Sequence, residues 1–356
     1  MKRIDDVRIN TEEILITPNQ LHKNVPHTKT AMETVYYTRQ AISHVLNLKD
    51  DRLVVIVGPC SIHNPLSALE YAKKLKVYKE QLSEDLIIVM RVYFEKPRTT
   101  VGWKGLINDP FLNGSYHVNT GLKMAHKLLL DINNLGVGAG TEYLDLISPQ
   151  YIADLISWGA IGARTTESQA HRELASGLSC PVGFKNATNG DVQVATDAII
   201  SASRPHFFMS VTKDGYSAVF STTGNLDCHI ILRGGKQPNY DAASIDDASH
   251  ILSKTNLESA IMVDCSHANS RKNIKRQIDV ATDLAKQISR GDNRITGIML
   301  ESHIKEGQQK TEPNKKPDPD ISITDACIGW EDTTKILIKL SEAVQSRRKK
   351  NLNGQK

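Results

Sequence analysis

The sequence predicts an α/β protein whose core is a (β/α)8 TIM barrel, with an N-terminal extension and an inserted β-hairpin. Eight short β-branched runs alternate with longer amphipathic segments, and a charged or metal-binding residue follows each run. Of the 356 residues, 40% are hydrophobic and 24% are charged, which are globular proportions and exclude wholesale disorder, collagen and a coiled coil. An open doubly wound sheet is the alternative, but such a sheet usually has fewer strands.

The expected strands are short runs of β-branched and aliphatic residues. In chain order they cover residues 53–58, 86–91, 138–142, 160–164, 182–185, 229–233, 261–265 and 297–301. Two further strand-like runs, 206–211 and 218–222, flank Asp214-Gly215, a dipeptide typical of hairpin turns. We therefore expect a hairpin at about 206–222, inserted between the fifth and sixth barrel strands.

Helical patterns occupy most of the intervals between these strands. The first fifty residues are compatible with helices separated by turns at Pro18 and Pro26. Residues 66–82 are amphipathic, and 269–289 form a longer helical pattern. The pattern at 119–133 ends at Gly136, a helix C-cap residue, and Ser148-Pro149 provides an N-cap and a first helical residue. The chain is thus divided into an extension (1–50), a barrel (51–347) and a basic, solvated tail (348–356).

Charge and cysteine usage restrict the possible partners and location. The 44 Lys and Arg residues against 40 Asp and Glu residues give a net charge of +4, which is too small to indicate a nucleic-acid partner. The N-terminus lacks a signal-peptide pattern, and no run approaches the ~18 apolar residues of a membrane span. The 5 cysteines are widely scattered along the sequence, and no two of them form a CxxC pair. These features predict a reduced, cytoplasmic enzyme with no membrane partner.

Cationic side chains gather at the ends of the predicted strands, where barrel enzymes build their active sites. They follow strands two, four, five and six: Arg91, Lys96, Arg98, Arg164, Lys185 and Arg233. Any one of them alone is best explained as a solvated loop charge. Together they would repel one another without an anionic ligand, and arginine and lysine suit phosphate and carboxylate groups. The predicted ligands are small substrates with several negative charges.

A second group of side chains could hold a metal ion at the same rim. It follows strands one, seven and eight, which become neighbours when the barrel closes: Cys60, His267, Glu301 and Asp325. This mixed donor set suits a borderline divalent ion such as Mn²⁺, Fe²⁺, Co²⁺ or Zn²⁺. Two alternatives remain. Cys60 could be a nucleophile served by Asp264 or His267, and Asp325 could cap the helix that begins near Glu331. No phosphate-loop or dinucleotide-binding motif indicates a nucleotide cofactor.

Long motifs along the chain resemble those of one enzyme family. They are GPCSIH (58–63), RVYFEKPRTTVGWKG (91–105), GARTTES (162–168), PVGFKN (181–186), ILRGG (231–235), DCSH (264–267) and SITDAC (322–327). The family is 3-deoxy-7-phosphoheptulonate synthase (DAHP synthase), type I, of the class regulated by aromatic amino acids. The resemblance covers nearly the whole chain, from about Arg8 to Arg347.

The resemblance implies a condensation of phosphoenolpyruvate with erythrose 4-phosphate that releases phosphate, the first step of the shikimate pathway to aromatic amino acids. It implies the metal ligands Cys60, His267, Glu301 and Asp325. It implies that phosphoenolpyruvate is bound by Arg91, Lys96, Arg164, Lys185 and Arg233, and erythrose 4-phosphate by Arg98 and Thr99. The implied catalytic residues are Lys96 as proton donor, and Glu142 with Lys185 as the residues that orient water.

The resemblance also implies feedback inhibition, with an aromatic amino acid bound away from the barrel mouth. The matching positions are Asp6, Pro149, Gln150, Leu174, Leu178, Ser179, Phe208 and Phe220. Asp6 favours phenylalanine as the effector, whereas Thr17-Pro18 resembles tyrosine-sensitive members, so tyrosine and tryptophan remain open. The extension 1–50 would serve regulation and oligomerisation. A homodimer or homotetramer is implied, because the effector site of this class includes the neighbour's N-terminus.

Three other functions remain as alternatives. The first is a related synthase that uses arabinose 5-phosphate, which the long extension, the hairpin and the segment 96–99 disfavour. The second is a catalytically inactive sensor of aromatic amino acids, which the complete metal and cation sets disfavour. The third is a nucleic-acid-binding protein that uses the basic tail, which the modest charge and the lack of accompanying aromatic residues disfavour.

Overall fold

The computed structural model describes residues 4–98, 102–312 and 315–353. Within it, eight parallel strands close into a barrel, in the order β1-β10-β9-β8-β5-β4-β3-β2. The strands are β1 (Leu53–Gly58), β2 (Leu86–Arg91), β3 (Ala139–Glu142), β4 (Trp158–Ile161), β5 (Val182–Lys185), β8 (Cys228–Leu232), β9 (Ile261–Asp264) and β10 (Ile295–Glu301). This closed topology confirms the predicted (β/α)8 barrel and excludes the open doubly wound sheet.

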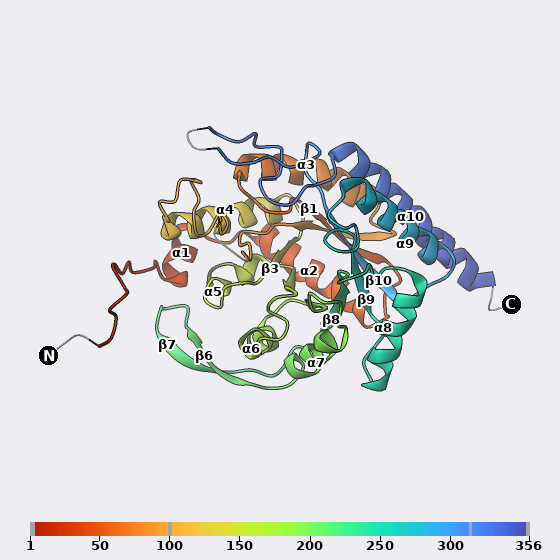
Figure 1. Ribbon diagram of the computed structural model, residues 1–356, viewed down its shortest axis with the longest axis horizontal. Helices are drawn as coiled ribbons and strands as arrows, with labels where there is room; N and C mark the ends of the chain where they lie inside the picture. Colours follow the sequence, from red (N-terminus) through yellow and green to blue (C-terminus); the bar gives the residue numbers. More distant parts are fainter. Residues whose placement is uncertain (1–3, 99–101, 313–314, 354–356) are drawn as a thin grey trace.

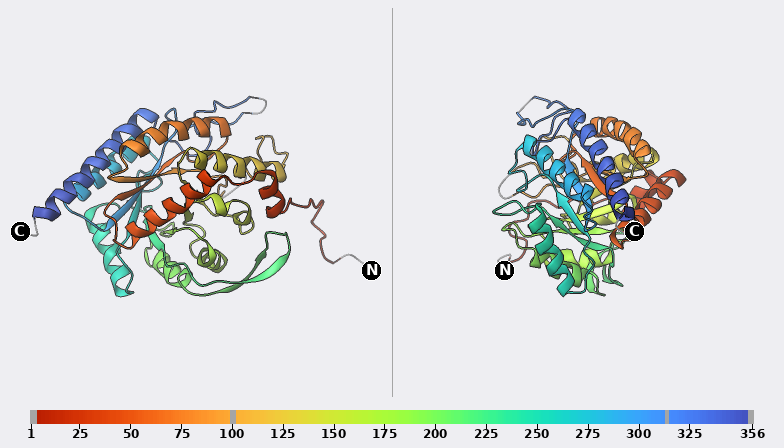
Figure 2. Two further views of the ribbon diagram at one scale, coloured as in Figure 1. Left: turned by 180° about the vertical axis from the view of Figure 1, so that it is seen from behind. Right: turned by 90° about the vertical axis from the view of Figure 1, so that its right-hand side faces the viewer.

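Helices surround the barrel, and most of them lie between its strands in the chain (Figure 1). They are α1 (Pro18–Asn24), α2 (Lys29–Leu46), α3 (Pro65–Gln81), α4 (Val118–Asn134), α5 (Pro149–Ile152), the 3-10 turn η1 (Ala153–Leu155), α6 (Gln169–Gly177), α7 (Gln193–Ala202), α8 (Ala242–Lys254), α9 (Ile274–Ser289) and α10 (Trp330–Asn353). The long C-terminal α10 packs along α9, as both views in Figure 2 show.

The barrel interior is filled by every second residue of its strands, because side chains alternate between the two faces of a strand. Val54, Ile56 and Val89 belong to this inner cluster, with further side chains from β4, β8, β9 and β10. The last turns of α2 contribute Ile42 and Val45 to the same cluster. The N-terminal extension therefore closes one end of the barrel and leaves the opposite, carboxyl end of the strands to polar side chains.

Two predicted boundaries were wrong by more than two residues. The fourth strand ends at Ile161 and not at residue 164, because the Gly162 carbonyl accepts hydrogen bonds from the backbone N–H groups of Thr165 and Thr166 in a turn. Arg164 therefore lies in a loop and is exposed. The helix expected from residue 269 begins only at Ile274. The preceding loop has residues with positive φ, and such residues interrupt a helix.

Two further predictions were wrong, one about a helix cap and one about the C-terminal tail. Pro149 occupies the first turn of α5 as expected, but Ser148 makes no side-chain cap and instead donates a hydrogen bond to Glu95. The basic run expected as a solvated tail continues α10 as far as Asn353. Arg348 within it pairs with Asp51 and Asp85, which holds this end of the helix against the barrel.

The predicted hairpin forms from β6 (Phe207–Val211) and β7 (Ser217–Ser221), which pair antiparallel. Gly215 has a φ of +87° at its turn, which is the conformation that glycine adopts without strain. The hairpin curves outside the barrel next to α5 and α6 (Figure 1). In the described part of the chain, no helix is both long enough and apolar enough to cross a membrane.

Candidate functional site

A layer of charged side chains covers the apolar barrel interior at the carboxyl ends of the strands. Side chains alternate between the two faces of a strand, so Val89, Met262 and Met299 point into the barrel. The same alternation points the last inward-facing residue of each strand into the rim. These residues are Arg91, Glu142, Lys185, Asp264 and Glu301, and all of them are buried. Burial of unpaired charges is costly, so the layer depends on mutual ion pairs. This rim is the candidate active site.

The structure brings three of the four predicted metal ligands together. The candidate ligand atoms of Cys60, Glu301 and Asp325 all lie within 4.8 Å of one another. Asp325 lies in the loop after β10 and lines a cavity of about 230 Å³ together with His267 and Glu301. It does not immediately precede α10, so the helix-cap alternative is wrong.

His267 lies at the edge of this group. Its Nε2 is 4.0 Å from Glu301 Oε1, while its Nδ1 is 2.9 Å from Asp264 Oδ2 and 2.7 Å from Ser266 Oγ. Contacts to Nδ1 orient the ring and leave Nε2 directed toward Glu301, which is a common arrangement for a metal-ligating histidine. The residue has a φ of +53°, an uncommon backbone conformation that often marks functional sites.

Lys96 contacts the metal-ligand group directly. Its Nζ donates to the backbone carbonyl of Cys60 at 3.0 Å and to Cys60 Sγ at 3.1 Å. Burial raises the pKa of the Cys60 thiol and the charge of Glu301 raises it further, whereas the charge of Lys96 lowers it. Lys96 therefore favours the thiolate form that metal binding requires.

Arg91 is completely buried beneath the same group. Its Nη2 donates to Glu301 at 2.9 Å, its Nε donates to the Pro59 carbonyl at 3.1 Å, and its guanidinium stacks on the ring of Tyr93 at 3.6 Å. These contacts fix the direction of the guanidinium group. A fixed guanidinium suits bidentate binding of an anion because little side-chain freedom is lost on binding.

Lys185 is held by two buried carboxylates. Its Nζ lies 3.1 Å from Asp264 Oδ2 and 3.7 Å from Glu142 Oε2. Although burial raises the pKa of both carboxyl groups, the charge of Lys185 contributes to holding both below their usual range. Gly162 leaves room for Glu142, since a Cβ at that position would lie 2.6 Å from Glu142 Oε1.

Asp264 is the site residue that the sequence reasoning missed, since it was considered only as a base for Cys60. It is fully buried and contacts Lys185 from the cation set and His267 from the metal set. The charges of His267 and Lys185 outweigh its burial and place its pKa well below 3.8. The strand alternation through Met262 could have identified Asp264 as an inward-facing residue at the rim.

The remaining predicted anion-binding residues lie further out. Arg233 is half-buried directly after β8, and its pKa is lowered by burial and then by the nearby charge of Arg164. The exposed Arg98 donates to the Trp103 carbonyl at 2.8 Å. Thr99 lies outside the described residues. The structure thus places Arg91 and Lys185 in the buried layer, the half-buried Lys96 beside it, and the other arginines nearer to solvent.

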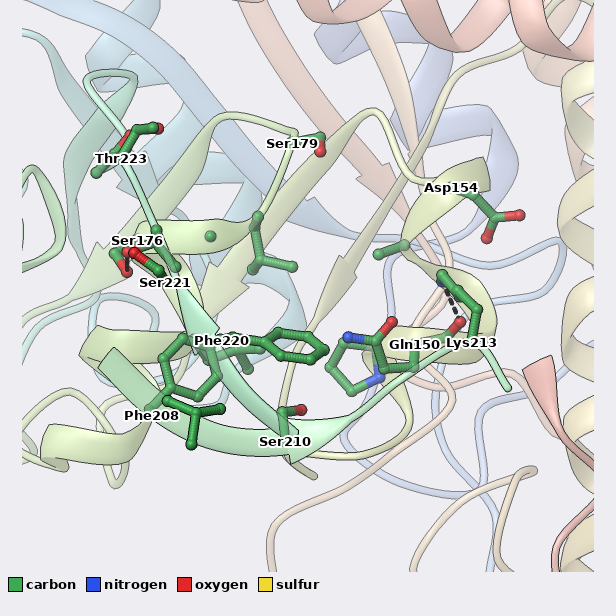
Figure 3. Close-up of a pocket in the computed structure, with 18 of the residues that line it drawn as sticks. Gln150, Asp154, Ser176, Ser179, Phe208, Ser210, Lys213, Phe220, Ser221 and Thr223 are labelled. Carbon is green, nitrogen blue, oxygen red and sulfur yellow. Dashed lines mark hydrogen bonds between the residues drawn. The ribbon is translucent and has the colours of Figure 1, made fainter. Parts of the chain in front are cut away.

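A larger cavity of about 990 Å³ lies outside the barrel between α5, η1, α6 and the hairpin (Figure 3). Seven predicted effector positions line it: Pro149, Gln150, Leu174, Leu178, Ser179, Phe208 and Phe220. The rings of Phe208 and Phe220 lie 5.9 Å apart. Asp6 is exposed and is not among the described residues that line the cavity. A single chain therefore brings together all of the predicted positions except the one in the N-terminal segment.

The chain resembles known proteins over almost its whole length. The model of a family described as the DAHP synthetase I family matches residues 22–338. The chain belongs to the DAHP synthetase I family. A relative from Escherichia coli (strain K12), phospho-2-dehydro-3-deoxyheptonate aldolase, Phe-sensitive, is 56% identical over 97% of this chain and 98% of that protein. The family membership predicted from the motifs is confirmed.

Other members of the DAHP synthetase I family are similar in sequence and structure. A Trp-sensitive aldolase from Buchnera aphidicola subsp. Baizongia pistaciae is 52% identical over 98% of this chain and 100% of that protein. The structure of the aldolase from Francisella tularensis SCHU S4 matches with a TM-score of 0.93 and 52% identity, covering 95% of this chain and 99% of that chain. The protein is therefore an enzyme of this family, which confirms the predicted enzyme class.

Proposed function

We propose that this enzyme condenses phosphoenolpyruvate with erythrose 4-phosphate and releases phosphate, in a metal-dependent reaction at the carboxyl end of the barrel. The observation that carries the proposal is the contact between the cation set and the candidate metal ligands, through Lys96 and Cys60 and through Arg91 and Glu301. Two phosphorylated substrates need several cations, and an aldehyde carbonyl needs polarisation. Both requirements are met by adjacent groups at one rim.

The donor set fits a divalent transition metal. One thiol and two carboxylates lie within 4.8 Å of one another, and His267 Nε2 lies beside Glu301. Sulfur, nitrogen and oxygen donors together suit Mn²⁺, Fe²⁺, Co²⁺ or Zn²⁺ better than Mg²⁺ or Ca²⁺. The proposed ligands are Cys60, His267, Glu301 and Asp325. A bound ion would supply Lewis-acid polarisation of the aldehyde oxygen.

The protein's own residues bind and orient the substrates. The proposed phosphoenolpyruvate site consists of Arg91, Lys96, Arg164, Lys185 and Arg233. Arg98 and Thr99 are proposed to bind the phosphate of erythrose 4-phosphate. Holding both substrates face to face lowers the entropic barrier for attack of carbon 3 of phosphoenolpyruvate on the aldehyde.

Proton transfers are assigned to two places at the rim. Lys96 would donate a proton to the new hydroxyl, because its Nζ lies beside the metal-ligand group. Glu142, which faces Lys185, would orient the water that adds at carbon 2 before phosphate leaves by C–O cleavage.

The proposed reaction is tested by following the loss of phosphoenolpyruvate absorbance on addition of erythrose 4-phosphate. With Mn²⁺ we expect turnover and release of phosphate in equal amounts, loss of activity on chelation, and recovery on readdition of metal. Arabinose 5-phosphate serves as the control aldose. Turnover with arabinose 5-phosphate alone would show the related synthase, and no turnover of folded, metal-loaded protein with either sugar would leave the sensor function.

We also infer that the cavity outside the barrel binds an aromatic amino acid as feedback inhibitor, with phenylalanine favoured. Its aromatic pair, Phe208 and Phe220, offers an apolar wall, and Gln150 and Ser179 offer polar groups. The Phe-sensitive relative supports phenylalanine, while the Trp-sensitive relative keeps tryptophan as the second candidate.

A Phe208→Ala substitution is expected to raise the phenylalanine concentration needed for half-inhibition by about tenfold, because it removes an aromatic contact. Turnover without inhibitor should be unchanged, since Phe208 is remote from the rim. Leu226→Ala is the control, because Leu226 is 85% exposed and lies outside both this cavity and the hairpin strands. Equal inhibition curves for all three proteins would refute the assigned effector site.

We further propose a homodimer or homotetramer in which the hairpin contacts a second copy. Phe207, Met209 and Val219 share its outer face and are exposed. Apolar residues grouped on one exposed face commonly mark an interface. Met209→Glu should therefore reduce the mass measured by sedimentation, whereas Leu226→Glu, at another exposed apolar position, should not. An unchanged mass for Met209→Glu would exclude this interface.

A further inference from the structure

Three histidines and one aspartate form a cluster that is separate from the barrel rim. His22 lies on α1, His27 in the connection between α1 and α2, His126 on α4, and Asp154 in η1. One candidate ligand atom of each residue lies within 4.8 Å of those of the other three. Segments far apart in the chain thus bring four metal-binding side chains to one point, where the N-terminal extension meets the barrel's outer helices.

His126 presents a lone pair to this point. Its Nδ1 lies 2.9 Å from the backbone carbonyl of Tyr151. Because a carbonyl only accepts hydrogen bonds, Nδ1 carries the proton and Nε2 of the neutral ring is unprotonated. Within the described part of the chain, this buried Nε2 has no hydrogen-bond partner. A backbone carbonyl on one ring nitrogen is the usual support for a histidine whose other nitrogen binds a metal.

Asp154 and His22 also have unsatisfied buried atoms at the same point. His27 Nε2 lies 2.5 Å from Asp154 Oδ2, whereas Asp154 Oδ1 has no hydrogen-bond partner among the described residues. His22 Nε2 lies 3.3 Å from Asp154 Oδ2 and likewise lacks a hydrogen bond. An ion pair between His27 and Asp154 is the purely structural explanation of the cluster. It leaves these buried polar atoms unsatisfied, which folded proteins generally avoid.

The electrostatics favour a cation over three protonated rings. The ring centroids lie 5.1–5.6 Å apart, so three imidazolium charges would repel one another. Burial lowers the pKa of His22 and His126, which keeps their rings neutral and able to act as ligands. Burial by itself raises the pKa of Asp154, but its hydrogen bond with His27 holds that pKa below its usual range.

We propose that His22, His27, His126 and Asp154 form a second metal site, which takes a divalent transition metal of the Zn²⁺ class. Three imidazole nitrogens and one carboxylate oxygen match a tetrahedral zinc site. Metal–ligand distances of about 2.0–2.1 Å would place the ligand atoms roughly 3.3 Å apart, so small side-chain rotations would close the cluster around an ion. The ion would replace the proton of His27 and satisfy the other unpaired atoms.

The position of the cluster gives such an ion a structural role. It would join α1, and the connection that follows α1, to α4 and η1. Asp154 also lines the cavity outside the barrel, near Lys213, whose Nζ donates to the Gln150 carbonyl (Figure 3). The second site would therefore hold the N-terminal extension against a wall of this cavity.

The test measures metal stoichiometry, with activity not required. Chelator-treated protein is loaded with Zn²⁺, dialysed, and assayed for zinc per chain by mass spectrometry. Wild-type protein should hold one equivalent more than His22→Gln or His27→Gln. Both residues are only half-buried, so the variants should fold, and circular dichroism checks this. His44→Gln, an exposed histidine at the far end of α2, should match wild type. Equal zinc in wild type and both cluster variants would overturn the proposal.

Loading with Co²⁺ distinguishes this site from the rim. Cobalt bound at the rim should show a thiolate-to-metal charge-transfer band because Cys60 is a candidate ligand there. The equivalent lost in His22→Gln should carry ligand-field bands without that charge-transfer band, since the cluster has no sulfur donor. Loss of the thiolate band in His22→Gln would instead assign the missing equivalent to the rim and refute the second site. The outcome is independent of whether the rim performs the proposed reaction.

Discussion

Replacement of Lys96 by alanine is expected to lower turnover by roughly 10²–10⁴-fold, the range for loss of a positioned general acid or base. Lys96 Nζ contacts both the carbonyl and the sulfur of Cys60, which places it beside the proposed metal ligands, where the aldehyde oxygen would be polarised. The measurement is steady-state kinetics with phosphoenolpyruvate and erythrose 4-phosphate at saturating metal. Most of the loss should fall on kcat, because Lys96 acts on a group that forms during the reaction.

The control for this variant is Lys254→Ala, which removes an exposed lysine at the end of α8. It should retain wild-type kinetics. The thermal unfolding midpoint and metal content of Lys96→Ala should be compared with wild type, so that a loss of fold or of metal is not mistaken for a loss of proton transfer. Full activity of Lys96→Ala would contradict its role as proton donor.

An Asp264→Asn substitution is expected to lower the free energy of unfolding by about 3–5 kcal/mol, as is usual when one partner of a buried ion pair is removed. Lys185 would lose its nearest carboxylate, at 3.1 Å, and retain only Glu142, at 3.7 Å. Chemical denaturation at neutral pH measures the difference. Glu70→Gln breaks the exposed pair with Lys73 and should change stability by less than about 1 kcal/mol.

The stabilisation by Asp264 should depend on pH with a defined sign. Its folded-state pKa lies well below 3.8, because the charges of His267 and Lys185 outweigh the effect of burial. A group with a depressed folded pKa stabilises the fold fully above its unfolded pKa and loses this effect as the pH falls toward the folded value. The gap between wild type and Asp264→Asn should therefore persist above the unfolded pKa of Asp264 and shrink as Asp264 is protonated in strong acid. A gap that grows on acidification would contradict the assigned ionisation.

Much of the barrel and its rim could be predicted from sequence because both depend on local patterns. The β-branched runs and their turns indicate the strands, and the period of two along each strand selects its inward-facing residues. Arg91, Lys185 and Glu301 were found from the strand runs alone, since each ends an apolar strand in the sequence and in the structure. Their proposed roles in catalysis came from the motifs and still depend on the kinetic tests above.

Other features were decided only by the tertiary structure. Arg164 left its predicted strand because a turn that begins at Gly162 ends β4 early. Asp264 became the link between Lys185 and His267 only when β5 and the end of β9 met at the rim. Asp6 lies apart from the cavity to which the motif comparison assigned it.

The cluster of His22, His27, His126 and Asp154 is the clearest example of a feature that the sequence could not predict. No local motif joins these residues, because they come from separate segments of the chain that meet only in the fold. Periodicity and motifs reflect the structure of residues that are close together in the sequence. They therefore predicted the barrel and the order of its rim residues. Contacts between distant segments depend on how whole helices and loops pack, so the ion pairs and the histidine cluster were decided by tertiary structure alone.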